Sequence, residues 1–294
     1  MIPLPKIEKP APSFVLYIAT GTETSPGMVY QTDENGRVMG KVPTPFTPAG
    51  MALHRDHGLI LAMPRDGGRI MEIDDTGKLN MLLEKDPTLL HPVDVGVAGK
   101  SDTIVVADNI KNVLAATTSG GTKPKIYQEF KGQKWTSQAM SVAVTNDKHV
   151  IFSTDGEPGV YRYAGDDHSA NAKPLLPAFG GVAADPNSLR WAAAQEPNLV
   201  YIYEGDQEIK KLRLPAGKTL YRNGLLSFSP AGSICVAVRD SDKPTDEVWL
   251  LMYNIEKDEI RSLFPWKGDQ MTDFVVGPRM LWNRNSPSGY KRTF

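Results

Sequence analysis

Short apolar strands recur along this chain, each starting behind a small or acidic residue. The starts are at Gly50, Asp94, Ser141, Gly181, Gly224 and Asp273. They lie roughly 40 to 50 residues apart, a period that predicts a β-propeller with one four-stranded blade per repeat. One blade cannot bury both of its faces alone, so we expect the repeats to close into a ring.

Each repeat also contains the further strands that a blade needs. Mostly apolar second strands, typical of strands covered on both faces, are predicted at 58–63, 103–108, 149–155, 189–195 and 233–240. Third strands, in which apolar and polar residues alternate more visibly, are predicted at 68–74, 112–118, 159–165, 198–205 and 247–254. Turn residues then lead into fourth, outer strands such as 78–84 and 209–215.

The two ends of the chain predict how the ring closes. Residues 15–21, 28–33 and 37–42 have the pattern of second, third and fourth strands, whereas 273–277 has that of a first strand without a complete blade behind it. Pairing them makes a shared blade and removes exposed sheet edges. The expected fold class is therefore all-β: a six-bladed β-propeller with four antiparallel strands per blade, whose closing blade is shared between the N- and C-termini.

We expect one domain over residues 1–294. About 1–12 form an N-terminal extension, and about 279–294 form a C-terminal segment to which the pattern assigns no place. Trp191 and Trp249 lie inside strand patterns and are expected in the core. Trp135 and Trp266 are expected in loops, where they could anchor contacts with a partner.

Composition narrows the classes of function. Lys plus Arg (33) nearly balances Asp plus Glu (34), which argues against a nucleic-acid partner. No stretch approaches the ~18 to 20 apolar residues of a membrane span. Residues 1–14 contain four prolines and lack the apolar run of a signal peptide. The lone Cys235 is expected to be an inert buried thiol. These features favour a cytoplasmic location, with a secreted or periplasmic one open if a signal has been removed.

Two stretches resemble known propeller families. TIVVADNIKNVLAATTSGG (103–121) is similar to an NHL-type repeat, and RNGLLSFSPAGSICVAVRDS (222–241) resembles a segment of the gluconolactonase, or senescence-marker, family. The second resemblance implies a divalent metal at the mouth of the central channel, held by oxygen ligands from several first strands. Asn223 matches the family's asparagine. The other repeats have Ala49, Val93, Met140, Gly180 and Thr272 at that position, and Asp94 and Asp273 come one residue later.

Acidic residues recur at the ends of the second strands. They are Asp66, Asp108, Asp155 and Asp240, with Gln195 at the fifth position and Asn109 beside Asp108. In register they would form a ring on one face of the disc that could bind a cation, a basic peptide or a polyhydroxylated ligand. The alternative is that these aspartates cap turns by accepting hydrogen bonds from backbone N–H groups.

Two hypotheses for function follow. The first is a non-enzymatic, NHL-like propeller without a cofactor, which binds a protein, peptide or glycan on one face through Asp66, Asp108, Asn109, Asp155, Gln195 and Asp240. The alternative is a metal-dependent hydrolase of lactones or esters, with Ca²⁺ or another divalent cation on Asn223 and Asp273 together with Asp94 or Asp108. A lyase on the same scaffold would need a general base that the sequence does not identify. The oligomeric state stays open, and fold alone does not choose among these.

Overall fold

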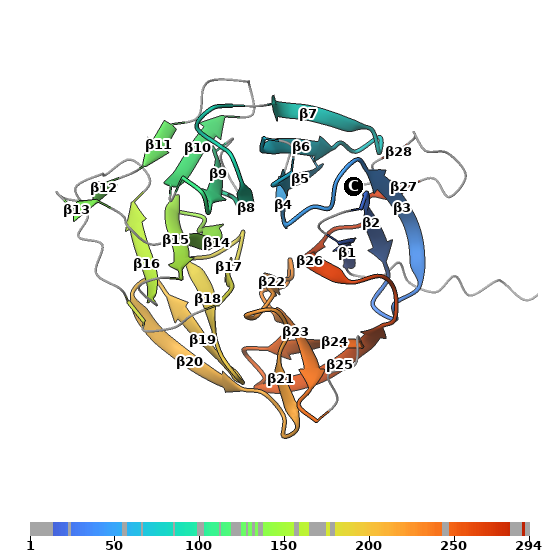
Figure 1. The fold of residues 1–294 in the computed structure, drawn as a ribbon. Coiled ribbons are helices and arrows are strands. Elements are labelled where there is room, and N and C mark those ends of the chain that lie inside the picture. Colours follow the sequence, from blue (N-terminus) through green and yellow to red (C-terminus); the bar gives the residue numbers. More distant parts are fainter. Residues whose placement is uncertain are drawn as a thin grey trace, which may run out of the picture.

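The computed structural model describes most of the chain. The described residues are 14–22, 25–54, 58–65, 67–84, 86–98, 103–111, 113–118, 125–127, 129–130, 133–134, 138–155, 159–164, 175–176, 180–242, 247–282 and 290–291. The elements among them are β-strands, which pair antiparallel in small sheets. Figure 1 shows these sheets arranged around a central axis, as in a β-propeller.

The sheets follow one another along the chain. The first comprises β4 (Gly50–His54), β5 (Gly58–Met63), β6 (Arg69–Ile73) and β7 (Leu79–Glu84). The next comprises β8 (Pro92–Val97), β9 (Thr103–Asp108), β10 (Val113–Thr118) and β11 (Lys125–Tyr127). A hairpin of β12 (Glu129–Phe130) and β13 (Gln133–Lys134) then precedes the three-stranded sheet of β14 (Ala139–Val144), β15 (His149–Thr154) and β16 (Gly159–Ala164).

Two further sheets lead to the end of the ring. One comprises β17 (Val182–Ala184), β18 (Arg190–Gln195), β19 (Leu199–Glu204) and β20 (Gln207–Arg213). The other comprises β21 (Lys218–Leu220), β22 (Leu226–Phe228), β23 (Ile234–Asp240), β24 (Val248–Asn254) and β25 (Glu259–Trp266). The repeat pattern did not predict β21, which pairs with the end of β23. In Figure 1 the innermost strands are β4, β8, β14, β17, β22 and β26.

Apolar residues fill the seams between neighbouring sheets. Between the β8–β11 and β14–β16 sheets, for example, Val105 packs with Val142 and Phe152 in one buried cluster. The second strands are buried nearly throughout because each has a neighbouring sheet on both faces. Cys235 belongs to such a seam, so the expectation of a buried thiol is confirmed. Burial raises the pKa of this thiol, which disfavours the reactive thiolate.

Small residues allow the innermost strands to approach closely. Opposite each repeat-start residue, the second strand has a small residue. The pairs are Gly50 with Ala62, Asp94 with Ala107, Ser141 with Ser153 and Asp273 with Ala19. Ala194 takes the same place beside Gly181. A Cβ added at Gly224 would come to 2.1 Å from the Ala194 Cβ, so a larger side chain at either position would push the sheets apart.

The closing sheet joins the two ends of the chain, as expected. Strand β26 (Met271–Gly277) pairs antiparallel with β1 (Val15–Thr20), which continues into β2 (Gly27–Thr32) and β3 (Val38–Thr44). Beyond β26 the chain packs on this sheet, although the sequence assigned no place to 279–294. Met280 and Trp282 are buried there with Tyr17. A short pairing of β27 (Leu281–Trp282) with β28 (Tyr290–Lys291) follows.

The tryptophan predictions are confirmed in part. Trp191 is fully buried, and Trp249 is half-buried against the core. The expectation that Trp266 lies in a loop is wrong, because it ends β25, is buried, and donates from its indole nitrogen to the Asp269 carbonyl at 2.8 Å. Strand β25 also contains Pro265, which is tolerated there because β25 is an outer strand. Trp135 lies outside the described residues.

Candidate functional site

Side chains at the repeat starts reach from one sheet to the next around the inner rim. In three places the side chain of a repeat-start residue accepts a hydrogen bond from the next sheet. The donor is the backbone N–H of the residue directly after that sheet's own repeat-start residue. These bonds are Val142 N–H to Asp94 Oδ2 (2.9 Å), Val182 N–H to Ser141 Oγ (3.1 Å) and Met51 N–H to Asp273 Oδ2 (2.6 Å). An inner strand has no partner on its axial side, so these side chains satisfy N–H groups that would otherwise lack an acceptor.

Gly50 interrupts this pattern and brings two carboxyl groups together. A Cβ added at Gly50 would lie 2.4 Å from Asp94 Oδ1. The carboxyl of Asp94 therefore occupies the space that a Gly50 side chain would need. Asp273 reaches the same strand from the other side through its bond to Met51, and its charge interacts with that of Asp94.

The environment of this carboxyl pair disfavours two negative charges. Burial raises the pKa of Asp94 to about 6, although hydrogen bonds from Val142, Ser141 and the Val95 amide oppose the shift. Burial, followed by the charge of Asp94, raises the pKa of Asp273 well above its usual range, against hydrogen bonds from the amides of Phe274 and Met51. Two interacting carboxyls in such a site titrate as a pair.

The three residues predicted to bind a metal have different surroundings. Asp94 and Asp273 interact, but Asn223 lies in the turn between β21 and β22, at a backbone φ of 60°. Its carbonyl accepts the N–H of Gly181 at 2.8 Å. The oxygens of the two aspartates suit a hard cation, yet both side chains already accept backbone hydrogen bonds. Within the described residues, no group of three or more His, Cys, Asp or Glu is placed to hold a metal ion.

Two of the aspartates predicted for the acidic ring accept hydrogen bonds from backbone amides of nearby segments. Buried Asp108 accepts the N–H of His91 at 2.6 Å, and the amides of Ile110 and Lys111 at 3.0 and 2.9 Å. Asp155 accepts the N–H of Gln138 at 3.1 Å. Asp108 ends β9 and Asp155 directly follows β15, and each carboxylate holds the residues that lead into the first strand of its sheet. Asp108 also caps the turn that follows it, the role set out as the alternative.

The remaining members of that set have other contacts. Asp240 accepts a hydrogen bond from Lys218 Nζ at 2.5 Å, and Gln195 Oε1 accepts one from the Tyr201 hydroxyl at 2.7 Å. The Asn109 amide donates to the His91 carbonyl at 3.2 Å. Asp66 lies outside the described residues. The contacts of these residues are local to their own sheets, and a ligand-binding ring remains a prediction.

A groove of about 470 Å³ lies where the β21–β25 sheet meets the closing sheet. Its floor includes the buried residues Phe14, Ser229 and Met252, and its rim carries Lys257 and Arg261. Each floor residue comes from a different part of the chain: the residue before β1, the turn between β22 and β23, and strand β24. The sequence did not reveal the groove, because its local pattern marks 229–232 only as a turn.

Among the described residues, only some of the polar groups that line the groove have hydrogen-bond or ion-pair partners. Ser229 Oγ accepts the Ser233 N–H at 3.1 Å, and its own proton has no acceptor among the described residues. Among the described residues, Lys257 and Glu259 form no ion pair. Arg261 is paired, since its guanidinium nitrogen lies 3.5 Å from a carboxylate oxygen of Glu34. Its guanidinium carbon also lies 5.8 Å from the centre of the Phe14 ring. A buried hydroxyl and two cations beside an apolar floor can bind a group that combines a carboxylate with an apolar side chain. The carboxylate of Glu259, which also lines the groove, opposes part of this attraction.

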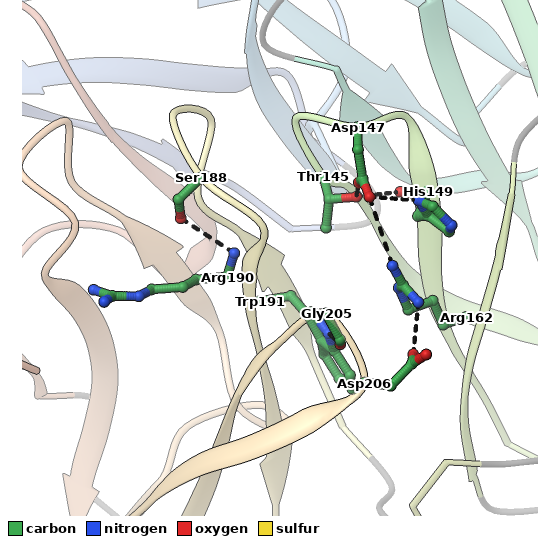
Figure 2. A network of polar contacts seen from close by, with 9 residues as sticks. All are labelled: Thr145, Asp147, His149, Arg162, Ser188, Arg190, Trp191, Gly205 and Asp206. Atoms are coloured by element: carbon green, nitrogen blue, oxygen red, sulfur yellow. Dashed lines mark hydrogen bonds and ion pairs between the residues drawn. The ribbon is translucent and has the colours of Figure 1, made fainter.

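Charges near the other outer seams are paired between sheets. Figure 2 shows Arg162, on β16, between Asp147 and Asp206, with Asp206 belonging to the β19–β20 turn of the next sheet. The same kind of pair recurs as Arg190 with Glu256, Lys210 with Asp258 and Arg261 with Glu34. In every case the cation belongs to one sheet and the acid to the third-to-fourth-strand turn of the next.

The described residues include no helix long and apolar enough to cross a lipid bilayer. No family model matches the chain, and no curated protein matches it. Solved structures match it over most of its length. A chain of a nidogen/laminin complex has 11% identity and a TM-score of 0.63, covering 90% of this chain and 97% of its own.

Two bacterial proteins give similar matches. A proposed 6-phosphogluconolactonase from Bacteroides uniformis has 12% identity and a TM-score of 0.57, covering 90% of this chain and 99% of its own. A protein from Lactobacillus plantarum has 13% identity and a TM-score of 0.58, covering 90% and 98%. At such identities the likeness shows the β-propeller fold alone.

Proposed function

We propose that this protein is a non-enzymatic, NHL-like propeller that binds a partner protein on one face. The observation that carries the proposal is the groove between the β21–β25 sheet and the closing sheet. Its volume of about 470 Å³ lies within the range of about 300 to 1,000 Å³ that is usual for small-molecule pockets. The nidogen/laminin structure, by its name a complex, offers a precedent for a protein partner on this fold.

The groove favours a peptide segment in which a carboxylate lies next to an apolar side chain. Lys257 and Arg261 would bind the carboxylate, and the Ser229 hydroxyl would donate to it. Phe14, Met252 and the exposed Ile260 would contact the apolar side chain. Strand β25 also ends its sheet, so an extended peptide could add backbone hydrogen bonds along its outer edge.

A displayed library of random peptides tests this proposal. We expect the protein to enrich sequences with an acid beside an apolar residue, and Arg261→Glu or Ile260→Asp to abolish the enrichment. Met81→Asp is the matched control, because Met81 is also an exposed apolar residue on an outer strand, β7. No enrichment, or enrichment that the groove variants leave unchanged, would overturn the proposal.

The alternative function is a metal-dependent hydrolase of lactones or esters. It is favoured by the juxtaposition of Asp94, Asp273 and the Ser141 hydroxyl at the inner rim. Its test is hydrolysis of lactones by chelator-treated protein with added Ca²⁺ or Mn²⁺. Turnover that requires the metal and is lost in Asn223→Ala and Asp273→Ala would establish the hydrolase. The absence of metal-dependent turnover at saturating metal would remove it.

We further propose that the ring has six blades. Four sheets have four strands and one has five, while the β14–β16 sheet has three. That sheet shows the beginning of a fourth strand, because Leu176 bridges Val160 and the Leu175 amide donates to the Val160 carbonyl at 2.7 Å. An experimental structure that traces residues 165–180 would test this: a strand there paired with β16 completes the sixth blade.

A further inference from the structure

Of the four ion pairs between neighbouring sheets described above, the one beside the groove is the loosest. Arg261 lies 3.5 Å from Glu34, whereas the distance is 2.6 Å for Arg162 with Asp206, 2.6 Å for Arg190 with Glu256 and 3.0 Å for Lys210 with Asp258. The side chain of Arg261 is also the most exposed of the four cations, at 57%. A guanidinium has five N–H donors, so a single distant carboxylate leaves most of those of Arg261 available to a ligand.

The position of Glu34 is set by the turn between β2 and β3, which packs on β25. A Cβ added at Gly36 in this turn would lie 2.6 Å from Cδ2 of Phe264, so the two segments are in direct contact. The Asp33 carboxylate accepts two backbone amides within the turn and keeps it closed. The side chain of Glu34 has no other polar partner in the described part of the chain than Arg261. It can therefore leave Arg261 without disrupting the turn.

The guanidinium of Arg261 also lies next to the apolar floor of the groove. Its carbon is 5.8 Å from the centre of the Phe14 ring, and both residues line the groove, whereas Glu34 does not. A ligand carboxylate bound to Arg261 from within the groove would therefore bring a second negative charge to a cation that Glu34 already faces. Two carboxylates beside one cation repel each other, so the ligand and Glu34 compete for Arg261.

We propose that Glu34 holds Arg261 in the free protein and gives it up to a carboxylate of the bound peptide, so that Glu34 is a built-in competitor for the groove. This inference rests on the proposed function, since it requires an acidic, apolar peptide to bind there. Glu34 lowers the affinity for acidic peptides and leaves that for neutral ones unchanged. An anion that approaches Arg261 no more closely than Glu34 does gains nothing by displacing it.

Glu34→Gln tests this competition, because glutamine keeps the length of the side chain and removes its charge. The probe is a fluorescein-labelled peptide of eight residues, the length of β25, in which aspartate and leucine alternate. Exposed ion pairs are weak, so the dissociation constant measured by fluorescence anisotropy should fall by only about two- to five-fold in the variant. A second probe with asparagine in place of aspartate should bind the wild type and the variant equally.

Glu256→Gln is the matched control. Glu256 lies in the β24–β25 turn directly before Lys257 and pairs with Arg190 at 2.6 Å, and it does not line the groove. Its replacement removes the same charge from the same side of the molecule, and it should change the affinity less than Glu34→Gln does. In an Arg261→Gln background, where binding is weaker, Glu34→Gln should have little effect because the shared cation is gone.

The possible results separate this inference from the proposed function. Thermal melts of the free proteins should agree within a few degrees, because an exposed pair contributes little to stability. An affinity that is unchanged or lower in Glu34→Gln, or that rises equally in Glu256→Gln, would overturn the competition and leave the groove as a binding site. No binding of the aspartate probe to the wild type or to Glu34→Gln, even at millimolar concentration, would count against the proposed function, and the inference would be lost with it.

Discussion

The backbone amide of Met51 donates a 2.6 Å hydrogen bond to Oδ2 of Asp273, which lies 222 residues later in the chain. The bond connects the start of β4 with β26, and β26 itself pairs with β1. The closing strand is therefore held by a ladder within its own sheet and by a side chain that reaches the next sheet. Changes on either side of this seam are expected to affect the stability of the whole ring.

Gly50→Ala should destabilise the seam strongly. The added Cβ would lie 2.4 Å from Asp94 Oδ1 and 2.5 Å from the Asp94 Cα, so the backbone of β8 would have to move. We expect a loss of about 2 to 4 kcal/mol in the free energy of unfolding, measured by urea denaturation. Gly205→Ala is the control. It has no neighbour within 4 Å but a φ of +59°, so it should cost only about 1 kcal/mol. Equal losses in the two variants would argue against a tight seam.

Tyr17→Phe should weaken the packing of the segment that follows β26. The Tyr17 hydroxyl donates to the Pro278 carbonyl at 2.8 Å and accepts the Met280 N–H at 3.0 Å. Its removal leaves both backbone groups without this partner at a buried site, which should cost about 1 to 3 kcal/mol in chemical denaturation. Tyr201→Phe, which removes a partly exposed bond to Gln195, should cost less. A larger loss in Tyr201→Phe would contradict this account.

Arg162→Ala and Asp206→Asn should differ, although both break the same ion pair. The Asp206 side chain is 75% exposed, while that of Arg162 is 14% exposed. Removing the exposed acid should change the free energy of unfolding by less than about 1 kcal/mol. Removing the arginine should cost more, because its aliphatic stem packs in the seam and Asp147 loses a partner as well. Equal losses in the two variants in thermal melts, both smaller at high salt than at low salt, would show that the charge alone matters.

Asp147→Asn should remove a contribution to stability that depends on pH. Burial would raise the pKa of Asp147, but hydrogen bonds from Thr145 and His149 and the charge of Arg162 lower it overall. Its stabilising contribution is therefore present above about pH 4, where the unfolded carboxyl is ionised, and is lost as the pH falls through the lower folded pKa. The variant should be less stable than the wild type at pH 7 and about equal at pH 2. A constant difference across this range would contradict the assignment.

The sequence predicts the inner strands well because their residues repeat with a common pattern. The start residues Gly50, Asp94, Ser141 and Asp273 all lie at the inner rim, and the small residues facing them keep the same register. This register is why Asp94 and Asp273 could be predicted to lie near each other. Ser141 was named as a repeat start, but its part in the site could not be inferred, since it depends on the offset between neighbouring sheets.

Features that join distant or irregular segments could not be predicted in this way. Asn223 matches a family pattern locally, yet β22 has three residues and follows the unpredicted strand β21, so the register there departs from the other repeats. The groove combines Phe14 near one end of the chain with Arg261 near the other. A periodic pattern describes each sheet by itself and contains no information on such a junction.

The ion pairs between sheets all have the same orientation along the chain, with the cation on one sheet and the acid on the following sheet. Arg162, Arg190, Lys210 and Arg261 each extend toward an acidic turn of the following sheet, and the last of them reaches Glu34 in the sheet that contains the N-terminal strands. These sheets are therefore not interchangeable modules, since each must match a predecessor and a successor. A duplicated or transplanted repeat would keep its apolar faces but place its charges opposite the wrong neighbour. A copied repeat would therefore keep its apolar seams at once, and it would recover these weak ion pairs only through later substitutions at the new junction.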